Sequence, residues 1–314
     1  MKQRRVGRDG PLAGAIGYGA MPLNWEYGTP VAEAEATAVV HRALDLGMTL
    51  IDTADAYGPN EELVGRTLRG RRADAVLSTK VGLVVRTAAP LTYDRDGRPD
   101  HIRASCDASL ARLRTDVIDL YTLHRVDPDV PVEESIGAMA GLVAAGKVRA
   151  IGLSEVDVDT LDRALRVHRI SSVQSELSLW TRGALADVVP WCDAHDVAFL
   201  AYSPLGRGYL TGKLDTADLA PSDFRSGLPR FERAAMEANR RIVDGIAAVA
   251  ERRGASNAQV ALAWLLAQSP RIIPIPGTKR IRYLEENAAA TGLELSAGDL
   301  ERLGALPDPL GARY

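Results

Sequence analysis

Four residues of this sequence, Asp52, Tyr57, Lys80 and His124, have the side chains needed to add a proton to a carbonyl oxygen. A free tyrosine hydroxyl has a pKa of about 10 and is a poor acid at neutral pH. The ammonium group of a neighbouring lysine lowers that pKa because it stabilises the phenolate, and a carboxylate would hold the lysine charged and oriented. A histidine N–H directed at the oxygen would stabilise developing negative charge, an effect commonly worth about 3 kcal/mol per donor.

Each of these residues also has an ordinary interpretation when it stands alone. An aspartate after a strand often caps a helix, a tyrosine often packs in a core, and a lone histidine is more often structural. A buried lysine at the end of a strand is also the residue that forms a Schiff base in a barrel aldolase. The chemistry therefore depends on whether the fold brings the four side chains together.

Short apolar runs stand directly before these polar residues. Residues 48–51 and 118–123 are typical of buried strands, and they end at Asp52 and His124. Residues 75–79 predict a further strand that ends just before the lysine. The carboxyl ends of the strands of a (β/α)8 barrel form the face that carries the chemistry. This spacing therefore predicts one site at that face.

Strands and helices alternate along the whole chain, which favours a parallel sheet. The predicted strands are 15–21, 48–51, 75–79, 117–123, 148–154, 172–175, 197–202 and 272–275. The predicted helices are 31–46, 61–68, 102–113, 132–145, 158–166, 184–194, 257–268, 281–290 and a short one near 297–303. We expect one domain over residues 1–314, a (β/α)8 TIM barrel with extra C-terminal helices. An N-terminal β-hairpin that turns at Asp9-Gly10 is expected to precede it.

Two long segments interrupt the alternation on the side where barrels bind ligands, at residues 81–100 and 203–230. The second is glycine-rich and carries cations at Arg207 and Lys213, so its backbone N–H groups could cradle a pyrophosphate. A flexible surface loop is the alternative. No Gly-x-Gly-x-x-Gly motif follows a strand, so a Rossmann site is not expected.

The last predicted barrel helix begins with a cluster of cations at Lys279, Arg280 and Arg282. A helix N-terminus favours a phosphate because its N–H groups are free and its dipole is positive there. Three cations suit a ribose 2′-phosphate, so the sequence predicts NADP(H) rather than NAD(H). A basic, solvated helix start is the alternative interpretation.

The composition is that of an ordinary globular enzyme. The 314 residues carry a net charge of −3, which leaves no basic field for nucleic acid. No apolar run approaches the length of a membrane span, and the charged N-terminus leads into glycine-rich sequence rather than an apolar signal region. The two cysteines, Cys106 and Cys192, have no metal-ligand spacing and are expected to be reduced structural thiols. We expect a cytoplasmic protein that uses no metal.

The motifs that carry the chemistry resemble those of the aldo-keto reductase superfamily over essentially the whole chain. The matching segments are Asp52-Thr53-Ala54-Asp55-Ala56-Tyr57-Gly58-Pro59-Asn60-Glu61, Ser78-Thr79-Lys80, Leu123-His124, Gly152-Leu153-Ser154, Tyr202-Ser203-Pro204-Leu205-Gly206, and Ile275-Pro276-Gly277-Thr278 followed by Glu286-Asn287. They resemble the bacterial and plant branch most, which is similar to pyridoxal-type reductases and potassium-channel β subunits.

The resemblance implies NADPH-dependent reduction of an aldehyde or ketone, with Tyr57 as the proton donor. It implies that the ring of Tyr202 stacks on the nicotinamide, that Ser154 and Gln174 bind its carboxamide, and that Glu286 and Asn287 reach the adenine. Further cofactor contacts are expected at Gly19, Met21, Ser203, Pro204, Leu205, Gly206, Gly208, Lys213, Gly277, Thr278, Lys279 and Arg282.

Two positions depart from the common pattern of the family. Glu155 stands where many members carry asparagine, so it either points elsewhere or binds a neighbouring cation. Tyr283 stands where the aldose reductase branch has an arginine that reaches the 2′-phosphate. That role would pass to the neighbouring cations.

The substrate is a small carbonyl compound that the sequence does not identify, and the oligomeric state stays open. Candidate walls of the pocket are Trp25, Tyr27 and Tyr93, with Trp180 and Phe224 as further candidates. The tail 305–314 either folds over the mouth or lies away from it. Two other functions are possible: a slow, NADPH-binding redox sensor or partner-regulating module, and a Schiff-base aldolase.

Overall fold

The computed structural model describes residues 1–24, 29–88, 91–214, 219 and 223–314. Eight parallel strands form one curled sheet, in the order β12-β11-β10-β9-β8-β5-β4-β3. Their bounds are β3 Tyr18–Gly19, β4 Leu50–Asp52, β5 Val76–Val81, β8 Ile118–Leu123, β9 Val148–Ser154, β10 Ser172–Glu176, β11 Ala198–Tyr202 and β12 Ile272–Pro274. Neighbours along the chain are thus neighbours in the sheet, as the alternating sequence predicts.

The first and last strands meet and close the barrel. The N–H of Gly17 donates to the carbonyl of Pro274 at 2.9 Å, and the N–H of Gly19 donates to Pro276 at 3.2 Å. The backbones approach so closely that a Cβ atom on Gly277 would lie 2.7 Å from the carbonyl oxygen of Gly19. Only a residue without a side chain fits there, which explains the glycines at both strand ends.

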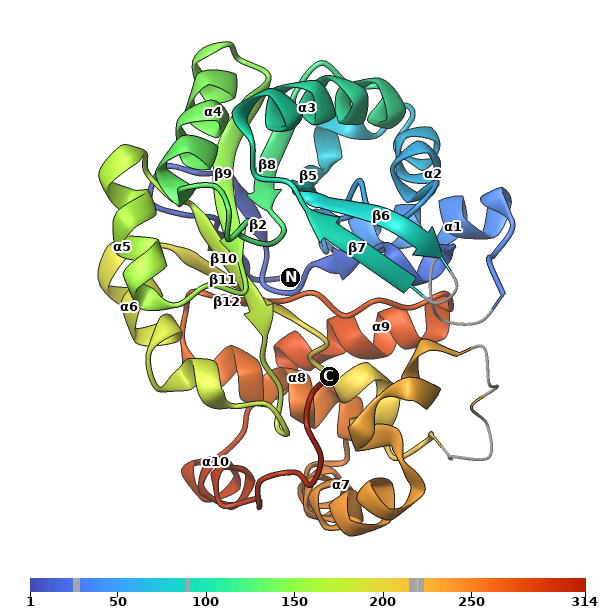
Figure 1. Cartoon of the computed structure of the whole chain (residues 1–314). Helices are drawn as coiled ribbons and strands as arrows, with labels where there is room; N and C mark the ends of the chain where they lie inside the picture. Colours follow the sequence, from blue (N-terminus) through green and yellow to red (C-terminus); the bar gives the residue numbers. More distant parts are fainter. Residues whose placement is uncertain (25–28, 89–90, 215–218, 220–222) are drawn as a thin grey trace.

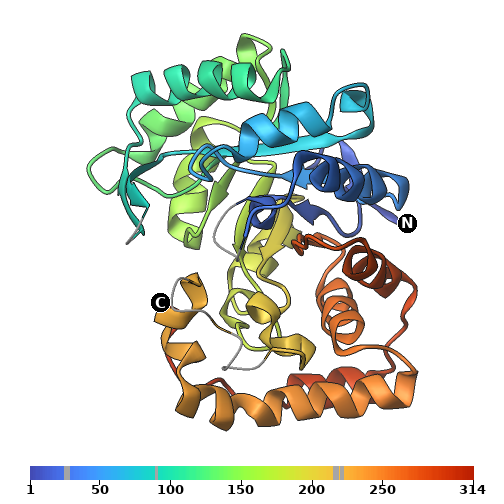
Figure 2. The same ribbon diagram turned by 90° about the vertical axis from the view of Figure 1, so that its right-hand side faces the viewer.

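Helices surround the strands, and their apolar faces pack on the outside of the barrel (Figures 1 and 2). Their bounds are α1 Glu33–Asp45, α2 Asn60–Thr67, α3 Pro99–Leu113, α4 Val132–Ala144, α5 Val158–Val167, α6 Val188–His195, α7 Arg233–Arg253, α8 Asn257–Gln268, α9 Ile281–Ala289 and α10 Ala297–Gly304. Among the described residues no helix is long and apolar enough to cross a membrane. The (β/α)8 barrel predicted from the sequence is confirmed.

The longest helix, α7, was not among the predicted elements; it runs along one edge of the molecule (Figure 2). Its buried residues recur at helical spacing, with Ile242, Val243, Ile246, Val249 and Ala250 facing the core. This periodicity is the signal that could have identified the helix. The predicted helix 184–194 is also shorter than expected, because Asp187 accepts a hydrogen bond from Val188 N and starts α6 there.

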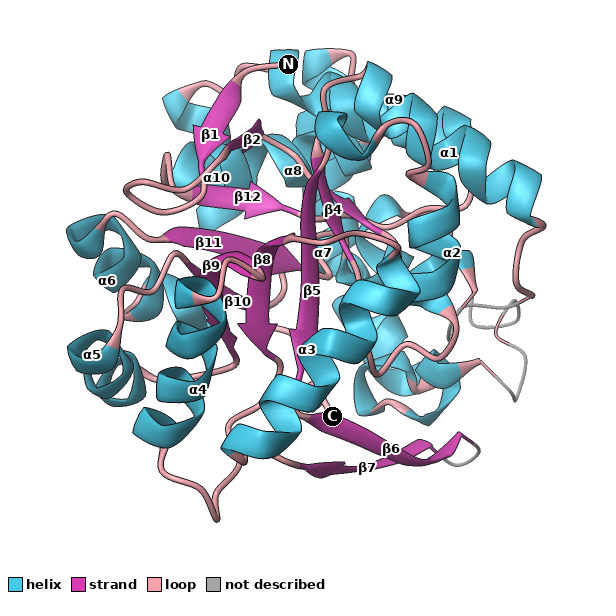
Figure 3. Cartoon of the chain, turned by 90° about the horizontal axis from the view of Figure 1, so that it is seen from above, coloured by secondary structure: helices cyan, strands magenta, loops and turns pink. Residues whose placement is uncertain are grey.

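The two ends of the barrel carry different hairpins (Figure 3). β1 (Gln3–Arg5) and β2 (Leu12–Gly14) pair antiparallel and confirm the predicted N-terminal hairpin. Ala13 of β2 and Val6, directly after β1, are buried in the apolar cluster that fills the barrel. At the opposite end, β6 (Leu83–Ala88) and β7 (Leu91–Arg95) form a hairpin inside the segment predicted as a long loop.

Strand periodicity decides which side chains enter the barrel. Successive residues of a strand face opposite sides. Leu50, Leu120 and Leu200 belong to the cluster inside the barrel, while Ile51 and Tyr121 pack under the helices. The residues two positions after these leucines also face into the barrel, and near the carboxyl ends of the strands such inward-facing residues are polar. They are Asp52, Thr122 and Tyr202, with Lys80, Ser154 and Gln174 at equivalent positions of the neighbouring strands.

Candidate active site

Three of the four predicted catalytic residues form one continuous contact at the carboxyl end of the barrel. The Nζ atom of Lys80 lies 2.6 Å from Asp52 Oδ2, 2.7 Å from the carbonyl oxygen of Thr53 and 3.4 Å from the hydroxyl of Tyr57. The lysine side chain is fully buried. Because β4 and β5 are neighbouring parallel strands, the aspartate and the lysine arrive side by side.

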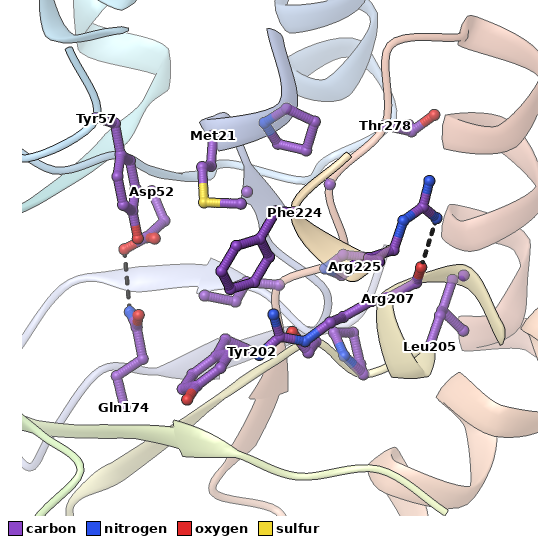
Figure 4. A pocket seen from close by; sticks show the side chains of 18 of the residues that line it. Met21, Asp52, Tyr57, Gln174, Tyr202, Leu205, Arg207, Phe224, Arg225 and Thr278 are labelled. Carbon is purple, nitrogen blue, oxygen red and sulfur yellow. Dashed lines mark hydrogen bonds between the residues drawn. The ribbon is translucent and has the colours of Figure 1, made fainter. Parts of the chain in front are cut away.

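The aspartate is held by neutral donors as well as by the lysine. Ser78 Oγ donates to Asp52 Oδ1 at 2.9 Å, and Gln174 Nε2 donates to the same oxygen at 3.1 Å (Figure 4). Burial is the largest influence on the pKa of Lys80 and lowers it, but Asp52 and Tyr57 together outweigh burial and raise the pKa overall. The lysine is therefore a fixed cation next to the tyrosine hydroxyl.

His124 lies against the same tyrosine. The two ring centroids are 5.7 Å apart with the planes 85° to each other, an edge-on contact. Burial, and then the positive charges of Lys80 and Arg125, hold the pKa of His124 well below its ordinary value. The ring is therefore neutral at physiological pH and has one N–H to donate. Its buried Nδ1 has no hydrogen-bond partner among the described residues.

These side chains open into a cavity of about 1100 Å³. The predicted site residues that line it are Gly19, Met21, Asp52, Tyr57, Tyr93, His124, Ser154, Gln174, Tyr202, Ser203, Pro204, Leu205, Gly208, Lys213, Gly277, Thr278, Lys279, Glu286 and Asn287. Lys80 lies behind this wall, and Gly206 packs against Trp180. Trp25 and Tyr27 lie outside the described residues. The cavity thus joins residues from all parts of the chain.

Figure 4 shows Tyr57 and Asp52 at one end of this cavity and Leu205, Arg207 and Arg225 at the other. The far end is built from the glycine-rich loop. Gly208 has a φ of 97°, and the carbonyl of Arg207 accepts a hydrogen bond from Arg225 Nη1 at 3.0 Å. Cationic side chains at Lys213 and Lys279 line the same region. A long, cation-lined cleft with exposed backbone turns fits a dinucleotide with several phosphates.

The cations at the start of α9 are not equivalent. Lys279 and Arg280 line the cavity. Arg282 is not among the lining residues; its guanidinium lies 4.5 Å from the ring centroid of Tyr283, and its Nη2 donates to the hydroxyl of that tyrosine at 2.8 Å. Lys279 precedes the helix and Arg280 is its N-cap residue, whereas Arg282 lies in the first turn. The three cations, although close in sequence, therefore do not converge on one point.

The C-terminal tail folds over the cavity, a point that the sequence left open. Arg313 and Tyr314 are lining residues. The hydroxyl of Tyr314 lies 3.1 Å from that of Tyr202, and its ring centroid lies 5.0 Å from the guanidinium of Arg207. Upstream, the backbone N–H of Leu310 donates to the buried Asn239 side chain at 2.7 Å and fixes the tail.

Glu155, the first departure from the family pattern, binds a cation of this tail. Its carboxylate forms an ion pair with Arg313 and accepts a hydrogen bond from the backbone N–H of Glu176 at 3.0 Å. Burial raises the pKa of Glu155, but these two partners outweigh burial and lower it overall. The backbone of Glu155 has a positive φ of 54°, a strained conformation of the kind that clusters at functional sites.

Several lining residues were not named individually from the sequence, although some lie in the loops 83–100 and 206–231, which were expected to wall the pocket. They are chiefly the apolar faces of the β6–β7 hairpin (Leu83, Val85) and the cations Arg95, Arg125, Arg225 and Arg313. The position of Arg125 next to His124 was the available signal. Phe224 lines the cavity as suggested. Trp180 does not, because its ring stacks on Tyr209 with centroids 4.8 Å apart in the core.

Comparisons with known proteins agree with this geometry. The family model described as "Aldo/keto reductase family" matches residues 15–307. A probable aldo-keto reductase from Glycine max is 38% identical over 316 residues, which cover 99% of this chain and 91% of that protein. The solved glycerol dehydrogenase of Gluconobacter oxydans superimposes with a TM-score of 0.88 at 31% identity, covering 99% of this chain and 98% of that chain. An aldo-keto reductase from Klebsiella pneumoniae, solved in complex with NADPH, gives a TM-score of 0.74 at 30% identity, covering 99% and 97%.

Proposed function

Because this chain belongs to the aldo/keto reductase family, we propose that it reduces an aldehyde or ketone to the alcohol with NADPH, and that Tyr57 donates the proton. The reaction is reversible. The observation that carries the proposal is the contact of the Tyr57 hydroxyl with the buried Lys80 ammonium at 3.4 Å, with Asp52 at 2.6 Å on the other side of the lysine.

Each residue has a separate part in the proton transfer. Lys80 places a fixed positive charge beside the Tyr57 hydroxyl, which stabilises the phenolate that remains after the proton has left. Asp52 keeps the lysine charged and oriented. His124 is neutral and stands edge-on to the tyrosine, so its N–H can hold the carbonyl oxygen near the proton donor. NADPH bound in the cavity supplies the hydride.

The cofactor assignment is supported by the residues that line the long cleft. Ser154 and Gln174 would bind the carboxamide of the nicotinamide, and Tyr202 would stack on its ring. Lys279 and Arg280 would bind the 2′-phosphate, and the loop at Leu205–Gly208, with its neighbouring cation Lys213, would lie against the pyrophosphate. The structure solved with NADPH belongs to a relative that is 30% identical.

A Schiff-base aldolase is disfavoured by the position of the lysine. Lys80 is fully buried and its ammonium has acceptors at 2.6 and 2.7 Å. A Schiff base needs a neutral amine that can reach the substrate carbonyl, whereas this amine is held charged behind Tyr57.

The decisive experiment follows NADPH oxidation with a panel of aldehydes for the wild type and for Tyr57→Phe. The variant loses the proton donor and should lose about 10²–10⁴-fold in kcat, the range of general acid catalysis, while NADPH fluorescence titration should give nearly unchanged affinity. Because Tyr57 and Lys80 act as a unit, a further Lys80→Met change should cost far less than in the wild-type background. Near-normal turnover by Tyr57→Phe would refute the assignment. Binding of NADPH without turnover of any carbonyl by the wild type would favour a redox-sensing module.

A further inference from the structure

The end of the cavity beside the proposed proton donor carries two arginines in an otherwise apolar wall. Leu83, Val85 and Val126 line this end, and Tyr93 adds a ring from the hairpin. Arg95 and Arg125 are the cations, from the end of β7 and from the residue directly after His124. Neither cation was predicted as a site residue from the sequence.

Arg125 is half-buried, and only one nitrogen of its guanidinium is held by hydrogen bonds to described residues. Its Nη1 donates to the carbonyl of His124 at 2.6 Å and to Ser154 Oγ at 3.1 Å. Its Nε and Nη2 atoms donate to no residue that the structure describes. A guanidinium presents its donors as a planar fork that matches both oxygens of a carboxylate, and here half of the fork is anchored by the protein.

Arg95 is exposed, and its side chain contacts the backbone just after Arg125. Its Nη1 donates to the carbonyl of Val126, the residue after Arg125, at 3.3 Å. The two arginines therefore flank one short piece of backbone, and the hairpin brings the second cation to the first.

The acidic residues of the cavity do not neutralise this pair. The described lining residues include three carboxylates, and each has its own cation: Asp52 pairs with Lys80 at 2.6 Å, Glu286 lies 3.5 Å from Lys213, and Glu155 pairs with Arg313. Arg95 and Arg125 have no ion pair with any residue in the described part of the chain. Glu155 lies near enough to Arg125 to feel its charge, but Arg313 is its direct partner. A surplus of positive charge thus faces the space beside Tyr57 and His124.

We infer that the carbonyl substrates preferred by this site carry a carboxylate, which Arg125 binds and Arg95 assists while the carbonyl group lies at Tyr57 and His124. This inference rests on the proposed function, since it names the substrate class of the same site. The apolar wall between the arginines and the tyrosine would contact the carbon chain or ring that joins the two groups.

The test uses two aldehydes of the same shape that differ in charge: 4-carboxybenzaldehyde, which is ionised at pH 7, and its neutral amide, 4-carbamoylbenzaldehyde. We expect kcat/KM for the acid to exceed that for the amide by about 10- to 100-fold, as charge-assisted hydrogen bonds permit. Arg125→Met should bring this ratio close to one, and Arg95→Met should lower it by a smaller factor. Added salt should also lower the wild-type ratio, because the site is partly solvated.

Two controls separate charge recognition from other effects. Arg103→Met makes the same substitution on the surface of α3, where Arg103 pairs with Asp100 at 2.9 Å outside the cavity, and should keep the wild-type ratio. NADPH fluorescence titration of Arg125→Met shows whether the arginine acts on the cofactor through Ser154 instead. A large loss of NADPH affinity with an unchanged acid-to-amide ratio would overturn the inference.

A binding measurement keeps the inference testable without turnover. Calorimetry of the NADP⁺-loaded protein with 4-(hydroxymethyl)benzoate and with 4-(hydroxymethyl)benzamide should show tighter binding of the acid, lost in Arg125→Met. If both aldehydes are reduced equally well, the carboxylate subsite is wrong and the proposed reductase stands. If neither aldehyde nor any other carbonyl is reduced, the proposed function fails, and the calorimetric comparison still decides the subsite.

Discussion

The buried pair of Lys80 and Asp52 should be as important for stability as for catalysis, and Lys80→Met separates the two effects. The substitution leaves the Asp52 carboxylate buried with two neutral donors, Ser78 Oγ at 2.9 Å and Gln174 Nε2 at 3.1 Å. An uncompensated buried charge of this kind costs about 3–5 kcal/mol. For a chain of 314 residues, this corresponds to a fall in Tm of about 5–8 °C.

The double variant Asp52→Asn/Lys80→Met removes both charges and should recover most of this loss, because replacing a buried ion pair by neutral groups is often close to neutral in stability. Activity should not recover in the double variant, since the charge that acts on Tyr57 is still missing. We expect kcat to stay at least about 10²-fold below the wild type in both variants. Differential scanning fluorimetry and steady-state NADPH oxidation measure the two quantities on the same samples.

Tyr57→Phe is the matched control, because it impairs catalysis without leaving a buried charge and should change Tm by about 1 °C or less. The reasoning is refuted if Lys80→Met melts like the wild type, or if the double variant melts as low as the single variant. The first result would mean that water compensates Asp52, and the second that packing of the lysine stem, not its charge, supports the fold.

Further outcomes concern the cofactor and the effect of pH. Replacing Lys279 and Arg280 together by alanine should weaken NADPH by about 10- to 100-fold with little effect on NADH, whereas Arg282→Ala should change either affinity by less than about 3-fold; equal losses for both cofactors would contradict a 2′-phosphate contact. Burial and then the charge of Glu61 raise the pKa of Asp55 to about 8. Between pH of about 4 and 8 the Asp55 carboxyl is therefore protonated in the folded state but ionised in the unfolded chain, and the free energy of unfolding falls as pH rises through this range. Asp55→Asn should therefore be more stable than the wild type by up to about 5 kcal/mol at pH 8 and similar to it near pH 4. Denaturant unfolding at both pH values measures this difference, and a difference that does not change with pH would contradict the reasoning.

The barrel could be predicted from the sequence because most of its strands and helices are marked by local residue patterns. Apolar runs of a few residues before a polar residue identify the strands, and helical spacing of apolar residues identifies most of the helices. Helix α7 was missed although Ile242, Ile246 and Val249 follow that spacing, because it comes after a long segment rich in glycine and proline. The β6–β7 hairpin was missed for a related reason: the apolar run of β6 is short, at Leu83-Val84-Val85, and the described residues of β7 after Leu91 are exposed, so no strand-length apolar pattern marks the pair.

The amino-acid sequence alone was enough to predict the barrel and the arrival of Asp52, Tyr57, Lys80 and His124 at one face. This follows because strand period and the alternation of strands with helices can be recognised locally, and the carboxyl ends of parallel strands face the same end of a barrel.

The surroundings of these residues depend on contacts that form only in the folded chain. Arg282 follows Lys279 by three positions, yet its guanidinium lies over Tyr283 rather than in the cavity. Arg313 lies 158 positions after Glu155 and binds it. Such contacts depend on how segments distant in sequence are placed in space and on which partner each charge finds, and no local pattern of residues encodes that choice.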